Sequence, residues 1–329
     1  GILWSDAHRE LRAFVEKTGI PFYTTPLGRG VIEEDHKLSF LAARSTAFRE
    51  ADCVMVVGTR LNYVIDYAKP PRFAEDAKLV QVDIDPSEIS KSRPADAAVV
   101  GDAKVVLQQL TEGNGVDPQR HAAWVSRLAE VDHEKGLDAE KRLATDQTPV
   151  HPLRLCKEVR DFMNRDAVLS VDGQEILNYG RQSIPVHTPG HSLNSGPFGT
   201  MGVGLPFGLG AKAAKPDTQV IVLHGDGSFG INGLEVDTAV RHNLPVITIV
   251  SNNGGWTAKD KFKVGRDLGF GPYDEMAKTF GCYGERVEDP AAIRPALQRA
   301  QESGKPALIN VITDPEARAR TAPFAVYST

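Results

Sequence analysis

The sequence predicts an α/β protein with two open parallel-sheet domains, and three observations lead to this prediction. Amphipathic segments alternate along the chain with short apolar runs, as helices alternate with strands in an open parallel sheet. The 329 residues are enough for two domains of roughly 100–200 residues each. A polar, charge-rich stretch at 120–141 separates two regions that both show the alternation.

The first domain is expected over residues 1–115 and contains one clear helix pattern and three strand patterns. Residues 6–18 carry apolar side chains at helical spacing, which predicts an amphipathic helix. A short strand is expected at 21–25. The nearly continuous apolar run 53–58 is typical of a strand buried on both faces of a parallel sheet. A further strand is expected at 79–85.

The second half of the chain begins with a helical linker, expected over residues 116–150. A diphosphate-binding domain is expected over 151–314, followed by a C-terminal tail at 315–329. In that domain the pattern predicts helices at 153–164 and 232–242 and strands at 167–171, 219–223, 245–250 and 307–312.

Composition and charge exclude several classes of function. The net charge is −5 and no basic stripe is present, which argues against a nucleic-acid partner. No window of about 18 apolar residues suggests a membrane span. Cys53, Cys156 and Cys282 lie too far apart for a disulfide framework or a zinc site. A reducing, cytoplasmic compartment is therefore expected.

The most informative motif joins two strand ends of the second domain. Gly225, Asp226 and Gly227 follow one apolar run, and Asn253 follows the next, 27 residues after Asp226. One strand–helix–strand crossover fits that separation, so both side chains are expected at the ligand-binding edge of the sheet. The Asp226 carboxylate, the Asn253 amide and the Gly255 carbonyl would supply oxygens to Mg²⁺. Gly225 and Gly227 would let the backbone approach a phosphate.

This motif resembles the signature of thiamine-diphosphate enzymes. The upstream segment 199–206 is similar to the loop that holds the aminopyrimidine of thiamine diphosphate in those enzymes. The resemblance implies that Met201 supports the bent cofactor, while the Gly199 carbonyl and the Met201 amide bind the pyrimidine edge. It also places Ser228 and Trp256 among the residues near the cofactor. Thiamine diphosphate and Mg²⁺ are therefore the expected cofactors, and the cofactor would supply an electron sink for C–C cleavage.

Other polar residues of the second domain leave alternatives open. Gln174 and Glu175 follow a strand at the same sheet edge. That position fits two alternatives equally: contact with the diphosphate or substrate, or no contact with either. His187 and His191 lie in a Pro/Gly-rich loop, where they would touch substrate or simply be solvated. His224 is expected to pack in the core.

The first domain is similar to the middle domain of 2-hydroxyacyl-CoA lyases and oxalyl-CoA decarboxylases, through segments 26–30, 42–45, 57–63 and 80–86. The resemblance implies an ADP site in which Arg60 contacts an anion and Asp83 contacts the ribose. The alternative is a local ion pair at Arg60 and a strand cap at Asp83. The tail is similar to the lid of acyl-CoA lyases, in which Arg318 and Arg320 would pair with CoA phosphates. The alternative is a solvated terminus.

Together these resemblances imply a thiamine-diphosphate-dependent 2-hydroxyacyl-CoA lyase, which cleaves its acyl-CoA substrate to formyl-CoA and an aldehyde or ketone. Oxalyl-CoA decarboxylase and an acetolactate-synthase-like enzyme are the alternatives within the family. A non-catalytic nucleotide-binding fragment is the alternative of another class. Family members carry an N-terminal pyrimidine-binding domain with a catalytic glutamate, and the resemblance of the given sequence begins only at the middle domain. A chain or domain that carries it is therefore an expected partner, in a homodimer or homotetramer.

Overall fold

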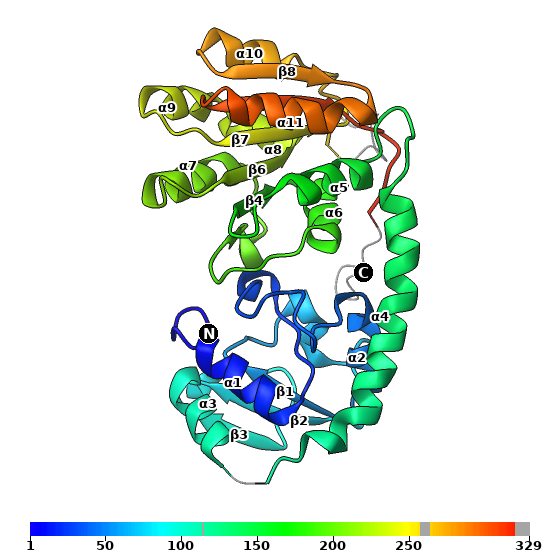
Figure 1. Cartoon of the computed structure of the whole chain (residues 1–329). Coiled ribbons are helices and arrows are strands. Elements are labelled where there is room, and N and C mark those ends of the chain that lie inside the picture. Colours follow the sequence, from blue (N-terminus) through cyan, green and yellow to red (C-terminus); the bar gives the residue numbers. More distant parts are fainter. Residues whose placement is uncertain (114, 257–263, 320–329) are drawn as a thin grey trace. The chain divides into compact units, whose positions relative to one another are not determined.

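The computed structural model describes residues 1–113, 115–256 and 264–319, which fall into two compact units (Figure 1). Among these residues, the first unit comprises 1–139 and 187–190, and the second comprises 140–186 and 191–319. Both units are α/β with parallel sheets, which confirms the predicted fold class. The division falls inside the long helix α4 (Ala122–Leu143), and the domain bounds expected from the sequence stay predictions.

The first unit contains a three-stranded parallel sheet in the order β1-β2-β3. The strands are β1 (Cys53–Val57), β2 (Lys78–Asp83) and β3 (Ala97–Val100). The helices of eight residues or more are α1 (His8–Thr18), α3 (Ala103–Glu112) and the greater part of α4, and a shorter helix, α2, spans Arg44–Glu50. Asp102 caps α3, since its carboxylate accepts the backbone N–H of Lys104 at 2.9 Å.

Two sequence predictions for the first unit are wrong. Residues 21–25 are described and form no strand, because their neighbour is a loop: Phe22 donates its N–H to the Leu38 carbonyl at 3.3 Å. The run at 53–58 does form β1, but it is not buried on both faces. Cys53 is exposed and the rest of β1 is half-buried, because β1 lies at the edge of the described sheet.

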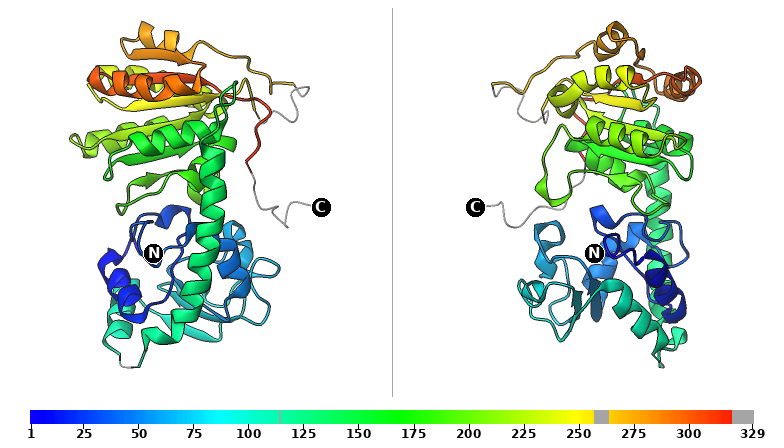
Figure 2. Two further views of the ribbon diagram at one scale, coloured as in Figure 1. Left: turned by 45° about the vertical axis from the view of Figure 1, so that its right-hand side comes forward. Right: turned by 90° about the vertical axis from the view of Figure 1, so that its left-hand side faces the viewer.

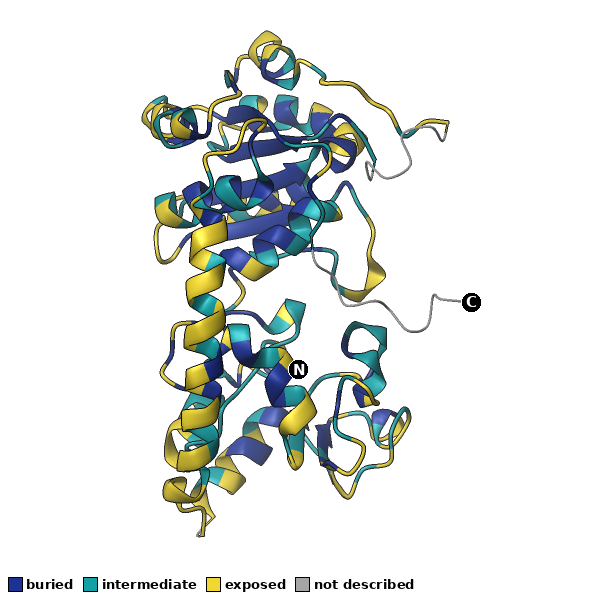
Figure 3. Cartoon of the chain, turned by 90° about the vertical axis from the view of Figure 1, so that its right-hand side faces the viewer, coloured by how far each residue is buried: buried dark blue, intermediate teal, exposed yellow. Residues whose placement is uncertain are grey.

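The second unit contains a six-stranded parallel sheet in the order β5-β4-β6-β7-β9-β8. Its central strands are almost wholly buried, as the dark blue strands in Figure 3 show, which is typical of a parallel sheet covered on both faces. The strands are β4 (Val168–Asp172), β5 (Ser192–Leu193), β6 (Val220–Gly225), β7 (Ile247–Asn252), β8 (Tyr283–Val287) and β9 (Ala307–Ile312).

Helices form a layer on each face of this sheet (Figures 1 and 2). One layer packs through Leu155, Ile176 and Leu297 and consists of α5 (Pro152–Phe162), α6 (Glu175–Ser183) and α11 (Ile293–Glu302). The other packs mainly through Leu205, Phe229 and Ala277 and consists of α7 (Gly204–Ala214), α8 (Asp226–Asn232), α9 (Val236–Arg241) and α10 (Tyr273–Thr279). No helix in the described part of the chain is long and apolar enough to cross a membrane.

The helix expected at 232–242 is confirmed over α9 (Val236–Arg241), but its first residues belong to other elements. In the structure α8 begins already at Asp226, and a 3-10 turn at Gly233–Glu235 separates α8 from α9. The interruption occurs at Asn232, whose φ of −131° and ψ of 24° are not helical. Asp226 therefore lies at the junction of β6 and α8, in the first turn of a helix.

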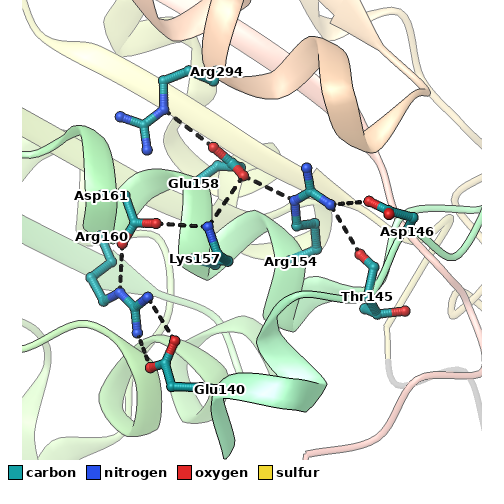
Figure 4. Close-up of polar contacts among 9 residues, drawn as sticks. All are labelled: Glu140, Thr145, Asp146, Arg154, Lys157, Glu158, Arg160, Asp161 and Arg294. Atoms are coloured by element: carbon teal, nitrogen blue, oxygen red, sulfur yellow. Dashed lines mark hydrogen bonds and ion pairs between the residues drawn. The ribbon is translucent and has the colours of Figure 1, made fainter.

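A network of ion pairs joins the end of α4 to α5 and α11 (Figure 4). The carboxylate of Glu158 is 9% exposed and accepts from Arg154 Nε at 2.9 Å and from Arg294 Nε at 3.2 Å. Arg160 Nη2 donates to Glu140 Oε2 at 3.1 Å. Because a buried carboxylate left without its cations is strongly destabilising, the Glu158 pairs stabilise the packing of α5 against α11, whereas Glu140 is 55% exposed and its pair contributes little.

Candidate cofactor site

The predicted site residues gather where three neighbouring strands of the second unit end. Asp172, Gly225 and Asn252 are the last residues of β4, β6 and β7. The register pairs Asp172 with His224 and Gly225 with Ser251, so the three strands end at nearly the same level. Because all three run parallel, this level is the carboxyl edge of the sheet, where α/β proteins bind ligands.

Asp226, Asn253 and Gly255 come together at this edge, as the motif predicted. One of the two end atoms of the Asn253 amide, oxygen or nitrogen according to how the group is turned, lies 3.1 Å from Asp226 Oδ1 and 2.9 Å from the Gly255 carbonyl oxygen. With nitrogen at that position the amide donates to both oxygens, and a half-turn of the group puts its own oxygen there. Neighbouring oxygens around octahedral Mg²⁺, bonded at about 2.1 Å, lie about 3.0 Å apart, so the spacing fits that cation.

The burial of Asp226 supplies a second reason for a cation at this place. The residue is 2% exposed, and its Oδ2 atom has no hydrogen-bond partner among the described residues. Desolvation raises the pKa of Asp226 to about 6, and the backbone N–H groups of Gly227 and Gly255 only partly oppose that shift. A buried carboxylate oxygen without a partner is costly, and a bound cation would relieve that cost. The residues present therefore fit Mg²⁺, although no cluster of three His, Cys, Asp or Glu occurs among the described residues.

Two glycines of the motif are required by close packing. Gly255 has a φ of +157°, and a Cβ there would lie 2.2 Å from the Arg266 carbonyl oxygen. A Cβ at Gly227 would lie 2.9 Å from the ring of Trp256, which therefore packs directly over the Gly-Asp-Gly turn. Trp256 also donates its backbone N–H to Arg266 at 2.8 Å. The structure thus brings Trp256 to the site, as expected.

The predicted cofactor-holding loop is anchored to the same sheet edge. Asp172 Oδ2 accepts the N–H of Gly204 at 2.8 Å, and Asn232 Nδ2 donates to the Gly202 carbonyl at 2.8 Å. Gly199, with a φ of +64°, is exposed, and Met201 is half-buried. Asp172 is a residue whose role the sequence did not reveal, although its position at the end of an apolar run was a usable signal.

Ser228 and His224 lie beneath the site rather than on its surface. Ser228 Oγ lies 3.0 Å from the Gly225 carbonyl and 3.1 Å from His224 Nδ1. Burial lowers the pKa of His224 to about 3, so its ring is neutral, and the expectation of a packed core histidine is confirmed. A direct contact between Ser228 and a cofactor stays a prediction.

An open pocket of about 310 Å³ is lined by Gln174, Trp256, Gly265 and Arg266, and the ring of Trp256 also packs against Gly227. Gln174 is exposed and available to a ligand. Gly265 and Arg266 were missed in the sequence, because loop pairing rather than a local pattern brings them here. Glu175 instead contacts the C-terminal segment.

Three polar residues named from the sequence contact other parts of the protein. Glu175 Oε2 accepts the N–H of Ala319 at 2.7 Å. His187 Nδ1 lies 3.3 Å from Asp35, and His191 Nδ1 lies 2.7 Å from the backbone carbonyl of residue 166. His191 is 5% exposed and the His187 side chain is 17% exposed, so the alternative of solvated histidines is wrong for His191, and contact of either with substrate stays a prediction.

The residues expected at an ADP or CoA site make local contacts. The Arg60 side chain is 73% exposed, with Nε 3.6 Å from Glu88, and Asp83 Oδ1 accepts the N–H of Asp85 at 3.0 Å. Arg318 Nη1 donates to the Pro315 carbonyl at 2.9 Å. Arg320 lies outside the described residues. ADP and CoA contacts at these positions stay predictions.

Comparison with known proteins identifies the family. Residues 1–110 match the family model described as "Thiamine pyrophosphate enzyme, central domain", and residues 177–311 match "Thiamine pyrophosphate enzyme, C-terminal TPP binding domain". The chain belongs to the thiamine pyrophosphate enzyme family. Thiamine pyrophosphate is another name for thiamine diphosphate, so the resemblance drawn from the motifs is confirmed.

Relatives with three different names match nearly the whole chain. The acetolactate synthase large subunit IlvG of Mycobacterium tuberculosis is 37% identical over 324 residues, which cover 95% of this chain and 58% of the relative. A 2-hydroxyacyl-CoA lyase of Oryza sativa is 35% identical over 341 residues, covering 98% and 59%. Oxalyl-CoA decarboxylase of Escherichia coli K12 is 33% identical over 331 residues, covering 96% and 58%. The chain therefore spans somewhat under three-fifths of the length of these relatives.

Proposed function

We propose that the protein is a carbon–carbon lyase dependent on thiamine diphosphate and Mg²⁺, and that its substrate is a 2-hydroxyacyl-CoA. The observation that carries the cofactor proposal is the buried Asp226 carboxylate. Its Oδ2 has no hydrogen-bond partner among the described residues, and its Oδ1 lies 3.1 Å from the Asn253 amide, which is 2.9 Å from the Gly255 carbonyl oxygen. The lyase among the relatives and the middle-domain resemblance support the choice of substrate.

The chain's own residues would divide the work at this site. Asp226, Asn253 and Gly255 would hold Mg²⁺, and the turn around Gly227 leaves room for a diphosphate. Asp172 holds the loop that carries Met201, and that side chain would support the cofactor. Bound thiamine diphosphate supplies an electron sink for the electrons of the cleaved bond.

Further parts of the proposal concern regions outside the metal set. Arg60 is exposed and Asp83 ends β2, which supports an ADP site in the first unit. The residue after Arg318, Ala319, donates its N–H to Glu175 Oε2, and this bond holds Arg318 near Glu175. That position supports a role for the tail over a CoA-bearing substrate. We also propose a cytoplasmic homodimer or homotetramer in which a pyrimidine-binding domain supplies the catalytic glutamate.

The test is an assay of the native protein with thiamine diphosphate and Mg²⁺ against three substrates in parallel. A 2-hydroxyacyl-CoA should give formyl-CoA with an aldehyde or ketone, and this result would support the proposal. CO₂ with formyl-CoA from oxalyl-CoA would instead identify a decarboxylase. Acetolactate from pyruvate would establish the second candidate, which the 37% identity to an acetolactate synthase favours. ADP binding without any turnover would identify a nucleotide-binding protein.

A further inference from the structure

A buried polar network lies directly behind the metal-ligand set. Asn252 at the end of β7 and Asn310 on β9 are both 0% exposed, and Asp274 in the first turn of α10 is 4% exposed. The register pairs Val250 with Asn310, so Asn252, two residues further along β7, lies on the same face of the sheet. Most of that face is otherwise packed with apolar side chains such as Leu308.

The two amides satisfy one another and converge on a single carbonyl. Asn310 Nδ2 donates to Asp274 Oδ1 at 3.0 Å and to the Gly271 carbonyl at 3.0 Å. Asn252 Nδ2 donates to Asn310 Oδ1 at 3.1 Å and to the same Gly271 carbonyl at 3.2 Å. Asn252 Oδ1 accepts the N–H of Gly254 at 3.3 Å. All four amide N–H bonds are therefore used, and two of them hold Gly271.

Gly271 ends the segment 264–271, which we call the return segment. The return segment pairs with residues 253–256, which we call the ligand loop. Trp256 donates its N–H to Arg266 at 2.8 Å, and Leu268 donates to Gly254 at 3.1 Å. Gly255 and Asp267 form an antiparallel bridge between the two segments. The orientation of the Gly255 carbonyl therefore depends on where the return segment lies.

The return segment has little apolar burial of its own to hold it in place. Val264 is fully exposed, Leu268 is 41% exposed and Phe270 is 46% exposed. Segments with exposed backbone bonds and few buried contacts open at low free energy. The two hydrogen bonds that Asn252 and Asn310 donate to the Gly271 carbonyl therefore attach the return segment to the sheet, at the end that leads into α10.

We propose that Asn310, acting with Asn252, is a positioning residue for the metal site. By holding the Gly271 carbonyl, the pair fixes the return segment, and the return segment in turn fixes the ligand loop that presents Asn253 and Gly255. Asn310 itself touches none of the proposed ligands. This inference rests on the proposed Mg²⁺ and thiamine diphosphate site, and it adds a residue on a fourth strand, β9, to that site.

The first experiment compares two buried-amide variants of the native protein. Asn310→Leu keeps the volume of the side chain and removes both donors to Gly271 and Asp274. Gln81→Leu is the matched control, because Gln81 is also 0% exposed and its amide bonds the backbone of Glu88 and Ser90 in the first unit. Mg²⁺ is titrated calorimetrically with saturating thiamine diphosphate, and amide hydrogen exchange is followed at Trp256 and Leu268.

Asn310→Leu should weaken Mg²⁺ binding by about 10- to 100-fold, the range seen when a partner of a metal ligand is removed. Exchange at Trp256 and Leu268 should accelerate in the same variant, whereas Gln81→Leu should leave both measurements within about twofold of the parent protein. Wild-type Mg²⁺ affinity together with unchanged exchange in Asn310→Leu would overturn the inference. If the parent protein binds neither Mg²⁺ nor thiamine diphosphate, the proposed function fails, while the exchange data still decide whether Asn310 holds the return segment.

A second experiment exchanges the amide of Asn310 and the carboxylate of Asp274, so that the test does not depend on a single variant that could fail to fold. Asn310→Asp places a carboxylate against Asp274 at the position of a 3.0 Å hydrogen bond and should weaken Mg²⁺ binding more than Asn310→Leu does. Adding Asp274→Asn restores a donor and acceptor between the two positions, so Mg²⁺ affinity should recover in part. No recovery in a folded double variant would count against the network.

Discussion

Replacement of Asp226 by asparagine should stabilise the metal-free protein and abolish Mg²⁺ binding. Asparagine keeps the size of the side chain. Its amide oxygen can accept the Gly227 N–H, which Asp226 Oδ1 accepts at 2.9 Å in the structure. The substitution removes the charge that burial disfavours. The folded protein should therefore gain stability from the same substitution that removes the metal ligand, which a residue with a purely structural role would not show.

The magnitude follows from the pKa of Asp226, which desolvation raises from 3.8 to about 6. Each unit of pKa difference corresponds to about 1.4 kcal/mol, so the ionised carboxylate destabilises the fold by about 3 kcal/mol. The protonated carboxyl does not carry this cost. Because the pKa is raised, the stability of the protonated form is fully present below pH 3.8, and it is lost as the pH rises through about 6 and Asp226 ionises. The difference between the variant and the parent should thus be largest near pH 7.5 and smaller at pH 5.

The assay is urea unfolding in EDTA at pH 7.5 and pH 5, with a calorimetric titration of Mg²⁺ and thiamine diphosphate. Asp237→Asn is the control, since its carboxylate is 42% exposed on α9 and pairs with Arg241. An exposed pair of this kind contributes at most about 0.5 kcal/mol. The reasoning is refuted if Asp226→Asn is less stable than the parent in EDTA at pH 7.5, or binds Mg²⁺ equally well.

Three further substitutions test other parts of the site. Gly255→Ala should weaken Mg²⁺ binding at least about tenfold in calorimetry, because the added Cβ displaces the ligand loop; unchanged affinity would contradict the close packing. Asp172→Ala should lower the free energy of unfolding by roughly 2 kcal/mol, because the N–H of Gly204 loses a charged acceptor, and an equal melting temperature would argue against the anchor. Glu175→Ala should speed tryptic cleavage of the C-terminal segment, because the Ala319 N–H loses its acceptor; parental cleavage rates would show that this bond does not hold the tail.

The sequence was sufficient for the parts of the site that depend on strand ends. A run of apolar residues followed by Gly-Asp-Gly, and a second run followed by Asn-Asn, determine which residues meet at a parallel sheet edge. The burial of Asp226, which is 2% exposed, could not be predicted in the same way, because it depends on tertiary packing around the turn rather than on a local pattern. The role of Asn310 was equally hidden, although an asparagine within the apolar run 307–312 is an unusual feature of a buried strand.

The burial of Asp226 also explains how the site would gain affinity for a cation. The desolvation of this carboxylate, worth about 3 kcal/mol, is incurred when the protein folds and does not recur when the metal binds. The Asn253 amide and the Gly255 carbonyl already lie at the spacing of neighbouring ligands, so little rearrangement is needed beyond a half-turn of the amide. Substitutions that loosen the ligand loop should therefore reduce Mg²⁺ affinity more than they reduce stability. Asp226→Asn should instead raise stability while it removes binding, and this opposition separates the ligand from the residues that hold it.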